Sequence, residues 1–524
     1  MKKTAIFFFF IACLAINSGK SQIIQYSEPD RDDPRTFNFE IIGKIAGNIL
    51  IYKNSKDLHY IAKYDQNMKL LGKEGLAFFP ERAKLLSTDF IAYSDFFYFI
   101  CQYYLKNTVY AVALKLDGNA KILGEPVLLD STGNISNTNN KIYTFINSED
   151  KQKILALKIN TKSQKEHIIS TSIFNKELTL LQTNSALLDM PEKNDFLGEF
   201  GIDNDGTVVC LRQSGTSQND NINKINLLTK PLSGSTFSDN QLVVKNVFLD
   251  NPHVKIDNKN KHYLITSFYS KLKRGNIEGL YYTLWDIAGN RELLNAATTF
   301  SDEYREDVRG QNTIKSAFND YYLKNLILRK DGGFMVIAES FYTSNRGNNS
   351  NRWDYMGSPY YNPMYGGNYF GGSGYYNSFY NPMFYSPFGG FGRFGGMNYN
   401  GMSNVTRYYV DNVAVISFEP DGKMEWSNVI RKSQYDDNTD NYLSYGLLNA
   451  GDKLQFIFNI QERRNNVITD QSISPAGQLD RNPTFKNPEK GYDFMPRHAK
   501  QIGAHQAIVP CMYRGYTCFS KIDF

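Results

Sequence analysis

The sequence is short of cysteine, of histidine and of net charge, and these shortages exclude several classes of protein. Five cysteines in 524 residues are too few to build a disulfide scaffold. The six histidines show no His-x-x-x-His spacing and the cysteines show no Cys-x-x-Cys spacing, so no metal motif is recognisable. The catalytic serine elbow and the glycine-rich nucleotide loops are absent as well. We therefore expect no metal, no cofactor and no catalytic residue from a known motif.

Charge and long apolar runs are equally scarce. The formal net charge is +5 and the charged residues are dispersed, which gives no electrostatic reason to expect nucleic acid or anionic lipid as a partner. The apolar run Ala5 to Ile16 is shorter than the roughly 20 residues of a membrane-spanning helix. It follows Lys2 and Lys3 and is followed by small residues, so residues 1–21 are predicted to be an export signal. Because this segment holds three lysines and no acid, its removal lowers the net charge to +2.

The export signal has one alternative interpretation. Phe10-Ile11-Ala12-Cys13 could serve as a lipoprotein cleavage box, which would leave Cys13 acylated. The apolar run continues past Cys13 where a polar tether should begin, which favours the first interpretation. Both interpretations predict an exported protein, in the periplasm, at the outer membrane or on the cell surface.

What the sequence does contain is a repeated unit of two short β-rich runs around a tight turn. One copy reads Val112-Ala-Leu-Lys-Leu-Asp-Gly-Asn-Ala-Lys-Ile-Leu, and another begins at Thr283. These turns fall near residues 67, 118, 176, 289, 422 and 477, with a weaker one at Ser233-Gly234. Once a long insertion is removed, the period is roughly 50 to 70 residues, repeated about seven times.

A second class of turn precedes the first by about 20 to 30 residues, at Gly47-Asn48, Ser94-Asp95, Asp205-Gly206, Asn258-Lys259, Asp331 to Gly333 and Ala450-Gly451. Two hairpins in each period make four strands in each period. Four-stranded antiparallel units at this spacing are typical of a β-propeller, in which each blade covers its neighbours. Residues 22–524 are therefore predicted to form an all-β propeller of about seven blades, within a range of about six to eight. The alternative of two or three β domains lacks the linkers it needs.

The insertion runs from Ser344 to Thr406 and is rich in Tyr, Phe, Gly, Asn and Pro, with the sequence Tyr-Asn-Pro-Met occurring twice. This composition cannot build a packed core, so the insertion is predicted to be disordered. Tyr and Trp among small polar residues are typical of adaptable binding loops, although a spacer without a ligand remains an alternative. The aromatic binding candidates are Trp353, Tyr360, Tyr361, Tyr365, Tyr369, Tyr375, Tyr376, Tyr380 and Tyr385.

The order of the turns predicts which residues share a face with the insertion. It follows a second strand and precedes a third, so it belongs with the other second-to-third loops and the blade-to-blade connections. The same face should carry the basic candidates Lys271, Lys273, Arg274, Arg463 and Arg464.

An acidic connection, Asp302 to Asp307, is also expected on that face. Paired carboxylates there could serve a glycan hydrolase, and for this alternative Asp302 and Glu306 are the residues to test. Interleaved Arg305 and Arg309 favour a self-paired, solvated surface instead.

The C-terminal strand, Tyr516 to Phe524, is predicted to close the ring by pairing with an N-terminal strand such as Phe37 to Ile42. Its alternation and terminal Phe also fit the last strand of an outer-membrane β-barrel, a second alternative. If Arg514-Gly515 forms a two-residue turn, Cys511 and Cys518 lie opposite each other, as a possible disulfide or as buried thiols.

The segment from about Asp331 to Phe524, without the insertion, resembles a group of uncharacterised exported proteins of Bacteroidota. The residues that carry the resemblance are Val413 to Trp426, Tyr442 to Asn449 and Gly491 to His498. The resemblance implies a propeller-like fold and an envelope location, and it brings no activity and no site residues. We therefore expect a non-catalytic binding or scaffold protein of the cell envelope, which contacts a protein or glycan through the propeller face and its aromatic insertion.

Overall fold

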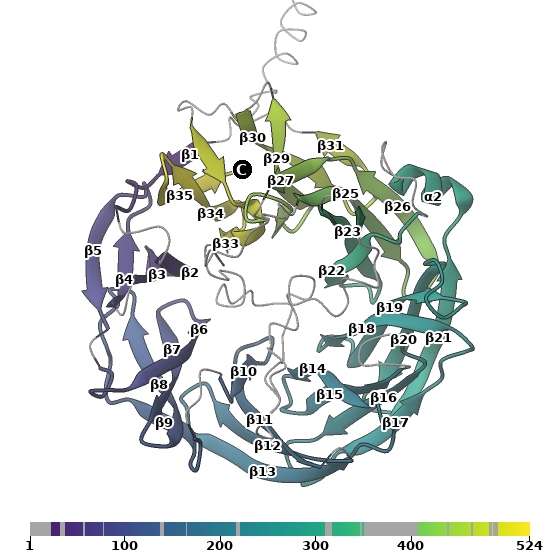
Figure 1. Ribbon diagram of the computed structural model, residues 1–524, viewed down its shortest axis with the longest axis horizontal. Coiled ribbons are helices and arrows are strands. Elements are labelled where there is room, and N and C mark those ends of the chain that lie inside the picture. The colour runs from purple at the N-terminus through teal and green to yellow at the C-terminus, as the bar shows by residue number, and fades with distance from the viewer. Residues whose placement is uncertain are drawn as a thin grey trace, which may run out of the picture.

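The computed structural model describes residues 23–31, 37–55, 58–76, 78–136, 141–163, 165–215, 221–309, 317–345, 348–349, 407–437, 440–462, 465–481, 485 and 491–524. Their strands divide among eight separate antiparallel sheets, which stand in a ring around a central channel (Figure 1). The fold is an eight-bladed β-propeller. This confirms the predicted all-β propeller of four-stranded blades. The strands form eight separate sheets and not the single closed sheet of the second alternative.

Within each blade, the strands are counted from the channel outward, from first to fourth. Blade 1 contains β2 (Phe37–Ile45), β3 (Asn48–Ser55), β4 (Leu58–Tyr64) and β5 (Leu70–Gly75). Blade 2 contains β6 (Lys84–Ala92), β7 (Phe96–Leu105), β8 (Thr108–Asp117) and β9 (Val127–Thr132). Blade 3 contains β10 (Thr144–Asn147), β11 (Lys153–Ser163), β12 (Glu166–Asn175) and β13 (Leu180–Asp189). Blade 4 contains β14 (Phe196–Ile202), β15 (Val208–Ser214), β16 (Lys224–Lys230) and β17 (Ser238–Leu242).

The second half of the ring follows the same plan. Blade 5 contains β18 (Phe248–Asp257), β19 (His262–Ser270), β20 (Gly279–Asp286) and β21 (Arg291–Thr299). Blade 6 contains β22 (Tyr321–Leu328), β23 (Phe334–Asn345), β25 (Arg407–Phe418) and β26 (Met424–Ile430), with the short β24 (Asn348–Asn349) and β27 (Gln434–Asp437) beside them. Blade 7 contains β28 (Tyr445–Asn449), β29 (Leu454–Glu462), β30 (Asn465–Ile473) and β31 (Leu479–Arg481).

Blade 8 joins the two ends of the described chain. It contains β32 (Tyr492–Phe494) and β33 (Lys500–Gly503) beside β34 (Gln506–Tyr513), then β35 (Tyr516–Asp523), and its outermost strand is β1 (Ile23–Tyr26). In Figure 1 the purple β1 lies among the yellow strands. Ile23 is opposite Asp523 and Tyr26 is opposite Ser520.

The prediction of ring closure was partly confirmed. The C-terminal strand pairs with a strand from the N-terminal part of the chain, as predicted, but this strand is Ile23–Tyr26, and Phe37 to Ile42 belongs to the first strand of blade 1. The ring has eight blades, which is within the predicted range of about six to eight and one more than the seven turns that the sequence displays. Both differences have one cause: the fourth strand of blade 8 comes from the other end of the chain, so this blade has no third-to-fourth turn to count.

The core lies between the blades. Each of the eight blade-to-blade interfaces holds one cluster of buried apolar residues, and a ninth, smaller cluster lies in blade 6. The run Phe96 to Cys101 shows why the middle strands are apolar without alternation. Phe97 and Phe99 pack toward blade 1 while Phe96 and Tyr98 pack toward blade 3, so both faces of the strand are buried.

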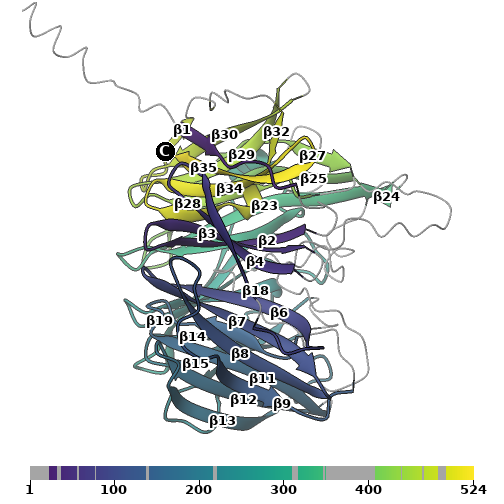
Figure 2. The ribbon, with the colours of Figure 1, turned by 90° about the vertical axis from the view of Figure 1, so that its left-hand side faces the viewer.

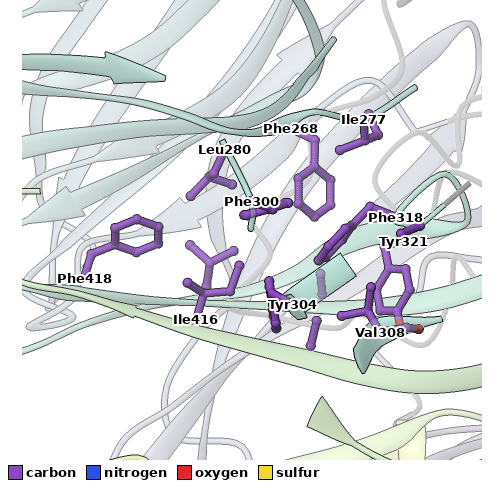
Figure 3. Packing of buried hydrophobic residues seen from close by; sticks show 14 of the residues in the cluster. Phe268, Ile277, Leu280, Phe300, Tyr304, Val308, Phe318, Tyr321, Ile416 and Phe418 are labelled. Atoms are coloured by element: carbon purple, nitrogen blue, oxygen red, sulfur yellow. The ribbon is translucent and has the colours of Figure 1, made fainter. Parts of the chain in front are cut away.

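The interface between blades 5 and 6 also takes in the only α-helix among the described residues, α2 (Asp302–Val308). Figure 3 shows Tyr304 and Val308 of this helix with Phe300, Phe318 and Tyr321. Ser301 caps the helix by accepting a hydrogen bond from the Tyr304 amide. The packing of these rings fixes the connection that leads from blade 5 to blade 6.

The turns confirm the predicted hairpins and define two faces. The first-to-second and third-to-fourth turns share one face, which we call the turn face; the second-to-third loops and blade-to-blade connections share the other, the insertion face. Neighbouring turns bond to each other, for example from the Ala46 amide to the Ser94 carbonyl (2.8 Å) and from the Asn204 amide to Asn258 Oδ1 (2.8 Å). These bonds tie neighbouring blades together on the turn face.

The insertion interrupts blade 6 between its second strand β23 and its third strand β25, as predicted. Residues 350–406 lie outside the described part of the chain. Figure 2 shows β24, the start of the insertion, beyond the ends of the neighbouring blades. The predicted export signal, with Cys13, also lies outside the described residues. No helix in the described segments is long and apolar enough to cross a membrane.

Candidate functional site

The insertion face carries the basic loop that the sequence singled out. Lys271, Lys273 and Arg274 are exposed in the loop between β19 and β20, and Leu272 between them is 72% exposed. Asn221 Oδ1 accepts a hydrogen bond of 2.6 Å from the Arg274 amide and helps to fix the loop. The other candidates, Arg463, Arg464 and all nine aromatic residues, lie outside the described part of the chain.

The acidic connection on this face is arranged differently from the prediction. Asp302 and Glu306 are exposed on α2. Arg305 does not pair with the acids of its own helix but donates to the carbonyl oxygens of Ile277 (3.0 Å) and Phe300 (3.2 Å). The helix turns the arginine toward blade 5, which explains why the local sequence suggested the wrong partners.

A cavity of about 530 Å³ lies in the channel against the first strands of blades 5 to 8. The charged and polar residues of its wall are Glu149, His253, Lys255, Lys324, Asn325, Ser444, Asn449, Arg497 and Gln501. Leucines and Tyr445 supply much of the remainder. The volume is in the usual range for a small-molecule site, roughly 300–1,000 Å³.

Local irregularities in the innermost strands shape this wall. Lys324 is the extra residue of a β-bulge in β22, between Leu323 and Asn325. Two more bulges occur at Glu199-Phe200 in β14 and at Asn251-Pro252 in β18. A bulge redirects a side chain and interrupts the ladder, and bulges are enriched beside functional sites.

The bulges of blades 4 and 5 bring Glu199 and His253 together. Glu199 Oε2 lies 3.3 Å from His253 Nδ1, and both side chains are 7% exposed. The same oxygen accepts a hydrogen bond from the Val254 amide at 3.2 Å, and Asn251 Nδ2 lies 3.2 Å from His253 Nε2. Glu199 and Asn251 both have positive φ, 57° and 55°, a conformation that costs energy outside glycine. This pair joins two blades at the edge of the cavity.

Lys255 and Lys324 differ from the other basic residues of the cavity, because neither side-chain ammonium group has a hydrogen bond or ion pair with any described residue. Burial lowers the pKa of Lys255 to about 8, with Glu149 opposing the shift. Glu149 itself accepts a hydrogen bond of 2.8 Å from Asn258 Nδ2. The Arg497 guanidinium, by contrast, contacts both the side-chain carboxylate and the backbone carbonyl oxygen of Asp440.

Beside the cavity, between blades 6 and 7, lies a fully paired charge. Lys432 Nζ is 3.0 Å from Glu339 Oε1, and the two side chains are 0% and 1% exposed. Lys432 also donates to Gln434 Oε1 at 2.9 Å, and Ser444 Oγ donates to the other oxygen of Glu339 at 2.5 Å. Burial lowers the pKa of Lys432, and Glu339 opposes that shift. Glu339 Oε1 meets Lys432 as an ion pair and has no hydrogen-bond partner among the described atoms. The network links the two blades and surrounds the lysine with partners.

Blades 1, 2 and 8 place further charges near the channel. Burial raises the pKa of Glu40 to about 8, against the influence of Lys500. Burial also raises the pKa of Asp89 and lowers the pKa of Lys500. Glu40 is therefore intermediate between the paired Lys432 and the unpaired Lys255. Its carboxyl is buried near a cation, but its Oε2 has no hydrogen-bond partner among the described atoms.

Cys511 and Cys518 lie opposite each other, with Arg514-Gly515 as the predicted two-residue turn. Arg514 and Gly515 have φ values of 50° and 82°, which are those of a hairpin turn that favours glycine at its second position. The two thiols are free, with their sulfur atoms 3.1 Å apart. Both are buried in the apolar cluster between blades 7 and 8, and burial raises the pKa of Cys511. The buried-thiol alternative describes this structure, and the disulfide stays a prediction.

His498 lies next to Arg497, in the connection that leads to β33. His498 is held neutral, because burial and the neighbouring Arg497 lower its pKa to about 3. No group of three or more His, Cys, Asp or Glu side chains within the described ranges is arranged to hold a metal ion.

Comparison with known proteins assigns no family to this chain. No family model matches the chain, and no curated protein matches it. Among solved structures, prolyl oligopeptidase B from Galerina marginata shares 9% identity over 92% of this chain and 56% of that chain, with a TM-score of 0.38. This chain thus spans little more than half of that enzyme.

Two further structures are similar over most of their length. An oligogalacturonate lyase in complex with manganese shares 7% identity over 96% of both chains, with a TM-score of 0.37. An uncharacterised protein from Listeria monocytogenes shares 9% identity over 88% of this chain and 99% of that chain, with a TM-score of 0.35. Likenesses this distant carry no argument about activity.

Sequence reasoning missed the cavity entirely. Lys255 and Lys324 are 69 positions apart in the sequence and belong to no motif, and only ring closure brings their strands to one wall. The one usable signal was local: Asn251-Pro252 inside an apolar strand indicates a bulge, because proline cannot donate to the ladder.

Proposed function

We propose that this protein is an exported, non-catalytic binding module of the cell envelope that contacts a protein or glycan partner through its insertion face. The observation that carries the proposal is the loop from Lys271 to Arg274, in which three exposed cations flank an exposed leucine on the same face as the insertion. A charged rim with an apolar centre is typical of recognition surfaces. The export, the bacterial group and the role of the aromatic insertion rest on the sequence and are part of the proposal.

A cross-linked pull-down from the native envelope tests this function. We expect the intact protein to recover a specific protein or polysaccharide, and we expect the recovery to be lost when Ser344 to Thr406 is replaced by a short Gly-Ser link. Replacing Lys271, Lys273 and Arg274 by serine should weaken recovery about tenfold, since electrostatic complementarity across an interface is removed.

The matched control removes three exposed lysines from the turn face, Lys69, Lys121 and Lys423. This variant loses the same positive charge, so unchanged recovery would separate a specific face from a general effect of charge. If both triple variants behave alike, or if the deletion recovers the same partner, the insertion face is not the recognition surface.

A further inference from the structure

The described lining of the channel cavity carries more positive than negative charge, and the excess positive charge forms no contact that holds the fold together. Three strongly basic side chains line it, Lys255, Lys324 and Arg497, and Glu149 is the only acidic residue in its described lining. Arg497 is neutralised by Asp440. Two ammonium groups are thus left facing one cavity with one carboxylate near them.

Neither ammonium is needed to hold the blades together. Neither Nζ forms a hydrogen bond or ion pair with a described residue, whereas the neighbouring Lys432 has a complete set of partners. Withdrawing a cation from water without a partner is unfavourable, and the lowered pKa of Lys255 reflects that penalty. An anion that enters the cavity would remove it.

The rest of the wall defines the kind of anion. Asn325 Oδ1 accepts a hydrogen bond from the Tyr445 hydroxyl at 2.7 Å, and its side-chain N–H groups donate to no other described residue. Asn449 lines the cavity beside Leu323 and Leu326. Gln501 also lines it, but its side-chain amide is engaged with the backbone of Asn449, at 3.1 and 2.8 Å. Amide groups suit hydroxyl-bearing ligands, and the volume of 530 Å³ suits a molecule of one or two sugar units rather than a polymer.

We propose that the cavity binds a small hydroxylated organic anion, whose carboxylate or phosphate group is held between Lys255 of β18 and Lys324 of the β22 bulge. This site uses none of the residues of the loop from Lys271 to Arg274, so it stands or falls independently of the proposed binding function.

Isothermal titration at pH 7 and low salt tests the site with four probes: gluconate, glucose 6-phosphate, inorganic phosphate and uncharged glucose. We expect gluconate or glucose 6-phosphate to bind the intact protein, and which of them binds decides between carboxylate and phosphate. Lys255→Met with Lys324→Met should weaken that binding at least about tenfold, the loss expected when buried charges no longer meet a charged ligand. Lys69→Met, which removes an exposed lysine of the turn face, should leave it unchanged.

Three outcomes would overturn the proposal. They are the failure of both organic anions to bind, binding of glucose as tight as that of the anions, and unchanged affinity in the double variant. The first would mean that the two lysines are simply solvated by channel water. Because Lys255 and Lys324 have no partners to lose, the variants should fold; a Lys255→Arg variant, which keeps the charge, should retain binding and guards against an effect of shape alone.

Discussion

Lys432 and Lys255 lie in neighbouring parts of the ring, and burial lowers the pKa of both. Lys432 is surrounded by Glu339, Gln434 and the Val410 carbonyl, at 3.0, 2.9 and 3.2 Å. Lys255 has no such shell and opens on a cavity. The difference teaches that desolvation alone does not define a functional residue. Lys432, with its partners in place, belongs to the architecture, whereas Lys255, without a partner among the described residues, fits the ligand site proposed above.

The largest expected effect comes from breaking the complete network. Lys432→Met should lower the free energy of unfolding by about 3–5 kcal/mol, because Glu339 would remain buried without its counter-charge. Urea denaturation at pH 7 measures this. Lys432→Met combined with Glu339→Leu should recover much of the loss, since no uncompensated charge remains. A single variant within about 0.5 kcal/mol of the parent would show that the pair is solvated and the comparison mistaken.

Glu40 gives an intermediate effect that depends on pH. Its pKa is raised to about 8 in the folded protein from an ordinary value of 4.5, so the unfolded chain loses its proton first. The stability that Glu40 contributes is complete below pH 4.5 and is lost as pH rises through 8. Glu40→Gln should remove this fall and be more stable than the parent at pH 8 by about 1–3 kcal/mol. Thermal unfolding at pH 5 and pH 8 checks it; parallel curves would refute the assignment.

The smallest effect is expected at Lys255, and its sign is opposite to that at Lys432. Lys255→Met should raise the free energy of unfolding at pH 7 by about 1–2 kcal/mol, because it removes a cation held out of water without a partner. The folded pKa is about 8 and the ordinary value is 10.5, so the gain should shrink as pH rises from 8 through 10.5, where the parent lysine becomes neutral in both states. A destabilised variant would mean that Lys255 has a structural role.

The sequence predicted most of the propeller because local turn chemistry repeats. Asp-Gly and Asn-rich turns, such as Asp117-Gly118, occur between runs of β-forming residues, and each pair of turns defines one blade. Closure by an N-terminal strand was predicted, but the particular strand was not, because Ile23–Tyr26 and Tyr516–Asp523 meet only in space. The acidic connection forms a helix with a local cap at Ser301 and with Tyr304 packed into the core. The packing is a tertiary effect that the sequence does not display.

The candidate sites divide in the same way. The basic loop around Lys273 follows from strand order and was placed on the correct face from the sequence. The cavity depends on the bulge at Lys324 and on the approach of blades 5 to 8, and no short-range pattern encodes either. Residues that come together only through ring closure cannot be recognised as one site from the sequence.

The most direct test of the contrast between the two lysines is competitive amine labelling followed by mass spectrometry, which reports the apparent pKa of each lysine in the folded protein. We predict that Lys255 titrates near pH 8 and labels readily, that its pKa rises when the bound anion is present, and that Lys432 does not label while the protein stays folded. A Lys255 pKa at or above its ordinary value of 10.5, or labelling of Lys432 as fast as Lys255, would contradict the account.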